Sequence, residues 1–186
     1  MKKFLLNLSM VVAVMMVVVQ PSSANQASFN ITVTISSFSM ELLNVNGDNP
    51  YGGWPITVPP GGSLTMVADD AVMISLTGDF GANGVDVVSY VANAGSWNAV
   101  EPPGTPVPPL ADEFYLFVDG YNIQPTGMEP LALSNAVPIT GGTEMPFYQM
   151  GASEDKAWLG YAFYAADNYT NPSENLEIMI EVKPLP

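Results

Sequence analysis

The sequence predicts an all-β protein that folds as an antiparallel β-sandwich in one domain, of the immunoglobulin-like or jelly-roll-like kind. Short segments alternate apolar and polar residues with period two, and proline and glycine recur between them. No segment keeps a helical period. Short alternating strands separated by turn residues, roughly every eight to twelve positions, are typical of sandwiches.

The N-terminus predicts export. Lys2 and Lys3 precede an apolar run at residues 10–19, and Ser22 and Ala24 follow as small residues. This order matches the charged, apolar and cleavage regions of a signal peptide. The run is also shorter than the ~20 residues that a membrane-spanning helix needs. We therefore expect residues 1–24 to be removed, residues 25–186 to form the domain, and no membrane span in the mature protein.

The first strand of the mature chain is expected at residues 29–35, where apolar side chains occupy alternate positions: Phe29, Ile31, Val33 and Ile35. The alternation slips by one residue at positions 36–37, which predicts either a bulge or a strand that crosses to the other sheet. No charged residue precedes Glu41 in this region. Such a strand can pair within its own domain, or it can add to a neighbouring copy as an assembly strand.

Later strands follow the same alternation, separated by turns rich in Asn, Asp, Gly and Pro. They are expected at residues 38–42, 54–58, 63–68, 72–76, 85–91, 114–118, 131–133, 146–150, 157–165 and 176–182. The proline-rich stretch at residues 101–109 fits a surface loop inside one sandwich better than a linker between domains.

The composition excludes most catalytic chemistries. After the expected cleavage, two lysines face 18 acidic residues, for a formal charge of −16, and Arg, His and Cys are absent. Without His or Cys, a Ser-His-Asp triad, a histidine-bound zinc and a thiolate nucleophile are unavailable. Without a cationic surface, nucleic-acid binding is excluded as well. Only a carboxylate pair, as in glycoside hydrolysis, remains as an alternative, so we expect no enzyme.

Two loops carry oxygen ligands of the type that calcium prefers, and calcium is the only cofactor that the sequence suggests. The first loop offers Asp79 and Asn83, and the second offers Asn44, Asn46 and Asp48. Asp, Asn and Gly are also ordinary turn residues, so a structural role is the alternative for both loops.

Aromatic residues could form a surface that stacks on a neutral glycan. Most of them lie within alternating strands, where core packing is the default. Trp97 lies in a loop-like stretch of small and polar residues, so we expect it to be the most exposed ligand contact.

The two ends of the chain resemble known proteins. Residues 27–35 read Ala-Ser-Phe-Asn-Ile-Thr-Val-Thr-Ile, and residues 156–164 read Lys-Ala-Trp-Leu-Gly-Tyr-Ala-Phe-Tyr, before a polar loop and a closing strand. This pattern resembles small secreted bacterial β-sandwich proteins of surfaces and matrices. Spore-coat-U-like and camelysin-like subunits share that architecture, and some form fibres. The resemblance implies a sandwich fold and a surface or matrix role.

The sequence thus favours a secreted, non-enzymatic structural protein of the bacterial surface or extracellular matrix, with the periplasm as an alternative location. Its expected partners are further copies, joined through the N-terminal strand as filament subunits, or other surface proteins. The alternative from a different class is a module that binds calcium or a neutral glycan.

Overall fold

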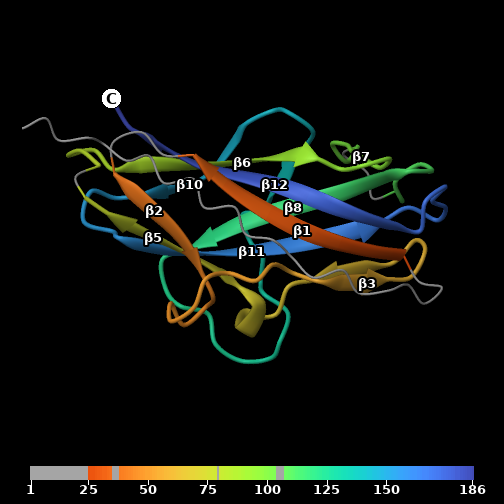
Figure 1. Ribbon diagram of the computed structural model, residues 1–186, viewed down its shortest axis with the longest axis horizontal. Coiled ribbons are helices and arrows are strands. Elements are labelled where there is room, and N and C mark those ends of the chain that lie inside the picture. Colours follow the sequence, from red (N-terminus) through yellow and green to blue (C-terminus); the bar gives the residue numbers. More distant parts are fainter. Residues whose placement is uncertain (1–24, 35–37, 79, 104–106) are drawn as a thin grey trace, which may run out of the picture.

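Two β-sheets packed face to face make up the computed structural model, which describes residues 25–34, 38–78, 80–103 and 107–186 (Figure 1). The predicted all-β sandwich is therefore confirmed. The predicted signal peptide lies outside the described residues. The only helix in the described ranges is a 3₁₀ turn at Ala68–Asp70, so none there is long and apolar enough to cross a membrane.

The smaller sheet has five strands in the order β10-β6-β12-β1-β3. In that order they cover Met145–Met150, Val85–Asn93, Ser173–Pro184, Asn25–Thr34 and Ile56–Val58. The larger sheet has the order β2-β5-β11-β8-β7, with β4 paired to β11 and β9 paired to β8. These strands cover Ser39–Leu43, Val72–Thr77, Lys156–Ala165, Glu113–Tyr121, Asn98–Ala99, Ser63–Thr65 and Val137–Ile139.

Most neighbouring strands run antiparallel, as a sandwich predicts, but two pairs are parallel. β1 runs parallel to β12, and β7 runs parallel to β8. The first pair places the first described strand of the chain beside its last strand (Figure 1). The second pair joins the two sides of the proline-rich stretch within one sheet.

The chain changes sheets between its first two strands. β1 belongs to the five-stranded sheet, and β2 belongs to the seven-stranded sheet. The prediction that the chain crosses where its alternation slips is therefore confirmed. The bulge, which was the alternative, would fall on residues 35–37, outside the described residues.

The expected strand at residues 131–133 is wrong. This segment instead lies against the outer face of the seven-stranded sheet, where a Cβ added at Gly160 would be 2.5 Å from Leu131 and 3.2 Å from Leu133. Its apolar residues are therefore explained by packing over a glycine. The sequence pattern does not predict the short strands β7 and β9, because two or three residues are too few to show an alternation.

The core lies between the sheets and draws on both. On β12, the residues at alternate positions are fully buried: Leu176, Ile178 and Ile180. From the seven-stranded sheet, β8 contributes Phe114 and Leu116, also with no exposed surface. Burying each such side chain stabilises the fold by about 1.5–3 kcal/mol, so the alternation of the sequence is what holds the two sheets together.

The sheets approach closely at Gly120 on β8. A Cβ at this position would lie 2.3 Å from the ring of Tyr148, which belongs to β10 of the opposite sheet. The contact therefore requires a residue without a side chain.

We predict that Gly120→Ala lowers the free energy of unfolding by about 1–3 kcal/mol, because the partly buried tyrosine ring, which packs against the core, must shift. Gly141→Ala is the matched control, since no atom lies within 4 Å of its added Cβ. Urea unfolding of both variants checks the prediction. Equal stabilities for the two variants would contradict it.

Candidate functional site

β1 lies between β12 and β3 in the five-stranded sheet. Its pairing with β12, called the β1–β12 seam below, is the candidate assembly site. Nine consecutive residue pairs join β1 to β12, from Gln26 beside Ser173 to Thr34 beside Glu181. On its other side β1 pairs with β3 through three residues. Among the described residues, β3 has no other strand partner in this sheet. β1 therefore connects β3 to the rest of the sheet.

The register matches the two alternating patterns. Positions 29, 31 and 33 lie beside Leu176, Ile178 and Ile180, the three fully buried residues of β12. The apolar positions of the predicted assembly strand are thus in phase with the buried positions of its neighbour. Ile35, the fourth residue of that prediction, lies outside the described residues.

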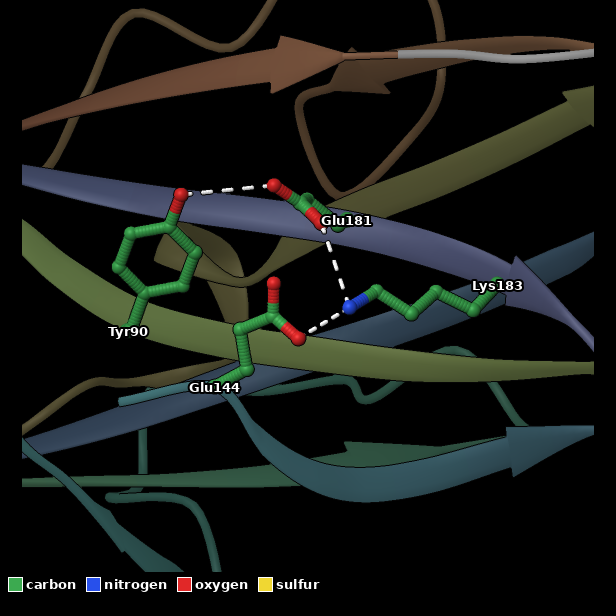
Figure 2. A network of polar contacts seen from close by, with 4 residues as sticks. All are labelled: Tyr90, Glu144, Glu181 and Lys183. Carbon is green, nitrogen blue, oxygen red and sulfur yellow. Dashed lines mark hydrogen bonds and ion pairs between the residues drawn. The ribbon is translucent and has the colours of Figure 1, made fainter. Parts of the chain in front are cut away.

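The face of β12 that points away from the core carries a polar network around Lys183 (Figure 2). The Lys183 ammonium forms an ion pair with Glu144 and lies 3.7 Å from the carboxylate of Glu181. Tyr90 on β6 donates a hydrogen bond of 3.4 Å to Glu181. The hydrogen bond to Glu144 raises the pKa of Lys183. Because these side chains are partly exposed, such pairs contribute at most about 1 kcal/mol.

Two carboxylates fasten the loop before β12 to its surroundings. Asp112, with a left-handed φ of 60°, accepts hydrogen bonds from the backbone N–H and the hydroxyl of Thr170. Glu174 accepts hydrogen bonds from Ser96, through both its N–H and its hydroxyl, and from Asn171. These contacts fix the chain where β12 begins.

These hydrogen bonds also lower the pKa values of both carboxylates. Those from Thr170 hold the pKa of Asp112 below its usual value. Burial acts to raise the pKa of Glu174, but the hydrogen bonds from Ser96 and Asn171 outweigh it, and the net pKa is lowered. Both groups therefore favour their charged form in the folded protein.

Trp97 packs beneath the same loop, so the expectation that it is exposed is wrong. Only 4% of its surface is accessible. Its ring lies 4.2 Å from that of Tyr169, and its indole N–H donates a 2.8 Å hydrogen bond to the Asn171 carbonyl. Tyr169 in turn donates to the carbonyl of Glu113 and accepts from the N–H of Ala166. Trp97 therefore anchors the loop.

The loop at residues 44–49 uses its oxygen atoms to hold a turn. Asn44 accepts hydrogen bonds from the backbone N–H groups of Asp48 and Asn49, and its amide donates to Asp48 at 2.7 Å. This last bond is the main reason that the pKa of Asp48 is lowered. Asn46 accepts a hydrogen bond from Gln124 instead. Asn44 and Asp48 thus meet, while Asn46 has a different partner.

The second predicted calcium loop is described only in part. Asn83 donates a hydrogen bond to the carbonyl of Pro186, at the end of the chain, whereas Asp79 lies outside the described residues. No group of three or more Asp, Glu, His or Cys side chains within the described ranges is placed to hold a metal ion. Calcium binding remains a prediction from the sequence.

Adjacent acidic residues occupy turns and strand ends and do not form a catalytic pair on one strand face. Asp69 and Asp70 form a 3₁₀ turn, and Asp112 precedes β8. The sequence did not predict the hydrogen bonds of Asp112 with Thr170 and of Glu174 with Ser96, because the partners are distant in the sequence. The left-handed conformation of Asp112 also gives no signal beyond the ordinary preference of Asp for turns.

Comparison with protein-family profiles and with curated protein sequences found no match to this chain.

We predict that Trp97→Ala destabilises the domain by about 3–5 kcal/mol, because it removes a buried ring from three aromatic neighbours. Trp97→Phe keeps an aromatic ring and loses the hydrogen bond to Asn171, so we expect a smaller loss than for Ala. Thermal or urea unfolding of both variants measures the difference. A stable Trp97→Ala variant would show that the loop does not depend on this ring.

Asp112→Asn should lower stability near neutral pH and have less effect in acid. Because the folded pKa of Asp112 is lowered, its charge stabilises the fold above the unfolded pKa of about 3.9, and this stabilisation disappears as pH falls through the folded pKa. Asn tolerates the left-handed backbone, so the variant removes the charge and one of the two acceptor oxygens without straining the turn. Melting temperatures across that pH range, with the exposed Glu101→Gln as a control, test this. A difference independent of pH would contradict it.

Proposed function

We propose that the protein is an exported, non-enzymatic structural component of the cell surface or extracellular matrix, whose copies assemble by exchanging β1. The observation that carries this proposal is the position of β1. It is the first described strand of the chain, and it fills the gap between β12 and β3. Removal of the predicted signal peptide would place β1 at the N-terminus, and a terminal strand can leave its sheet without unthreading the rest of the chain.

Exchange between copies would preserve the contacts of the closed domain. The strand from a second copy has the same sequence, so it can pair with β12 and β3 in the register seen here. Swapping an identical element is a low-cost route to association for this reason. When each copy donates to the next, the contact does not close, and a filament results.

The composition of the strand suits this role. Asn25–Thr34 contains no charged residue, although the whole chain has a net charge of −14. The strand therefore brings backbone hydrogen-bonding groups to a neighbour without adding charge. Export would follow from the predicted signal peptide. The chain ends resemble small secreted sandwich proteins of surfaces and matrices, and some relatives of these by architecture form fibres.

The alternative of a calcium- or glycan-binding module has less support. Trp97, its expected contact, is buried, and the oxygens of Asn44 and Asp48 take part in hydrogen bonds within their turn. A thermal shift on addition of calcium or a simple neutral glycan would favour this alternative.

A disulfide between β1 and β3 tests strand exchange. Gln26 and Thr57 are opposite each other in the antiparallel pair, so Gln26→Cys/Thr57→Cys should form a disulfide within one copy. The natural sequence contains no cysteine that could interfere. Oxidation at low protein concentration closes the domain, and reduction reopens it.

We expect the oxidised variant to stay monomeric at concentrations where the reduced variant and the wild type form filaments. Light scattering and negative-stain electron microscopy measure the outcome, with Thr57→Cys alone as the control for the substitution. Filaments from the fully oxidised, closed variant would rule out strand exchange. A wild-type protein that stays monomeric under all conditions would refute the proposed function.

A further inference from the structure

The outer side of the β1–β12 seam is acidic. Glu177 and Glu181 occupy positions on β12 that alternate with its buried residues, and both are partly exposed. In the register, Glu177 lies beside Asn30 and Glu181 lies beside Thr34. A neutral strand is therefore bordered by two carboxylates.

The charged groups described around this border sum to a negative charge. Facing the same side are Asp86 and Tyr90 from β6, Glu144 from the segment before β10, and Lys183 from β12 itself. Lys183, the only cation among them, already pairs with Glu144 and Glu181, and Asp86 accepts a hydrogen bond from Gln149. The surface around the seam therefore keeps a net negative charge at neutral pH.

We propose that Glu177 and Glu181 act as an electrostatic brake on the exchange of β1, so that copies assemble when these charges are screened by salt or neutralised by acid. This inference rests on the proposed function. An approaching copy is itself strongly acidic, and it must bring its strand to this border. Like charges that meet at a contact oppose association, and they do so less as the salt concentration rises.

The connection between β1 and β2 keeps the two bodies close. β1 ends at Thr34 and β2 begins at Ser39, and a chain of five residue steps spans at most about 18 Å. A donor whose strand lies in the next copy therefore holds its own body near Glu181. At physiological salt, charges interact over about 8 Å, so those at the seam matter more than those on distant surfaces. Protonation removes the negative charge of a carboxylate, so acid acts on the same two groups as salt.

The test compares two double variants that change the total charge equally. Glu177→Gln/Glu181→Gln removes the two charges at the seam. Glu101→Gln/Glu129→Gln removes two exposed charges outside the five-stranded sheet, one after β7 and one beside Pro130, which bridges to Val67. Filament growth of the full mature chain is followed by light scattering at low and high sodium chloride and from neutral pH to about pH 5, slightly above the ordinary Glu pKa.

We expect the seam variant to assemble roughly tenfold faster than the wild type at low salt and neutral pH, and to lose most of its response to salt. The distant variant should remain close to the wild type.

Equal acceleration of both variants would overturn the local brake in favour of net charge, and no acceleration of either would overturn it altogether. If the disulfide between β1 and β3 blocks assembly while the seam variant behaves as the wild type, the brake alone fails. If no protein assembles under any condition, strand exchange and the brake both fail.

Discussion

The structure depends on the pairing of its first described strand with its last. β12 lies between β6 and β1, and its buried side chains, Leu176, Ile178 and Ile180, face the opposite sheet. Without β1, one side of β12 would lose its backbone partner, and β3 would lose its connection to the sheet. The first described strand thus completes the sandwich, and the proposed exchange rests on this position.

Three strands at the sheet edges carry features that discourage pairing with a second chain. β10 contains Pro146 and an irregular register beside it, and β7 is only two residues long. β2 leads into a turn that folds back on it, where Tyr51 donates its N–H to the Leu42 carbonyl. Proline, bulges and short edges are the usual protections against edge-to-edge association. β1 is longer than these edge strands and has no charged residue, as its proposed role in joining copies requires.

The alternation of residues was enough to predict the sandwich and most of its long strands, because burial on one face of a strand leaves a local pattern. The parallel pairing of β1 with β12 leaves no local pattern, since it joins opposite ends of the chain. Trp97 was misjudged for the same reason: its loop is rich in small and polar residues, but Tyr169 and Asn171 reach it from the far end of the sequence. Residues 131–133 show the converse error, in which apolar residues that cover a glycine resemble a strand.

The most direct measurement of the central claim uses filaments grown from an equal mixture of two isotopically labelled preparations, one with ¹⁵N and one with ¹³C. Solid-state NMR then detects contacts that occur only between copies. Strand exchange predicts contacts between copies along the register of residues 26–34 with residues 173–181. If β1 and β12 are in contact only within single copies of the filament, the account is contradicted.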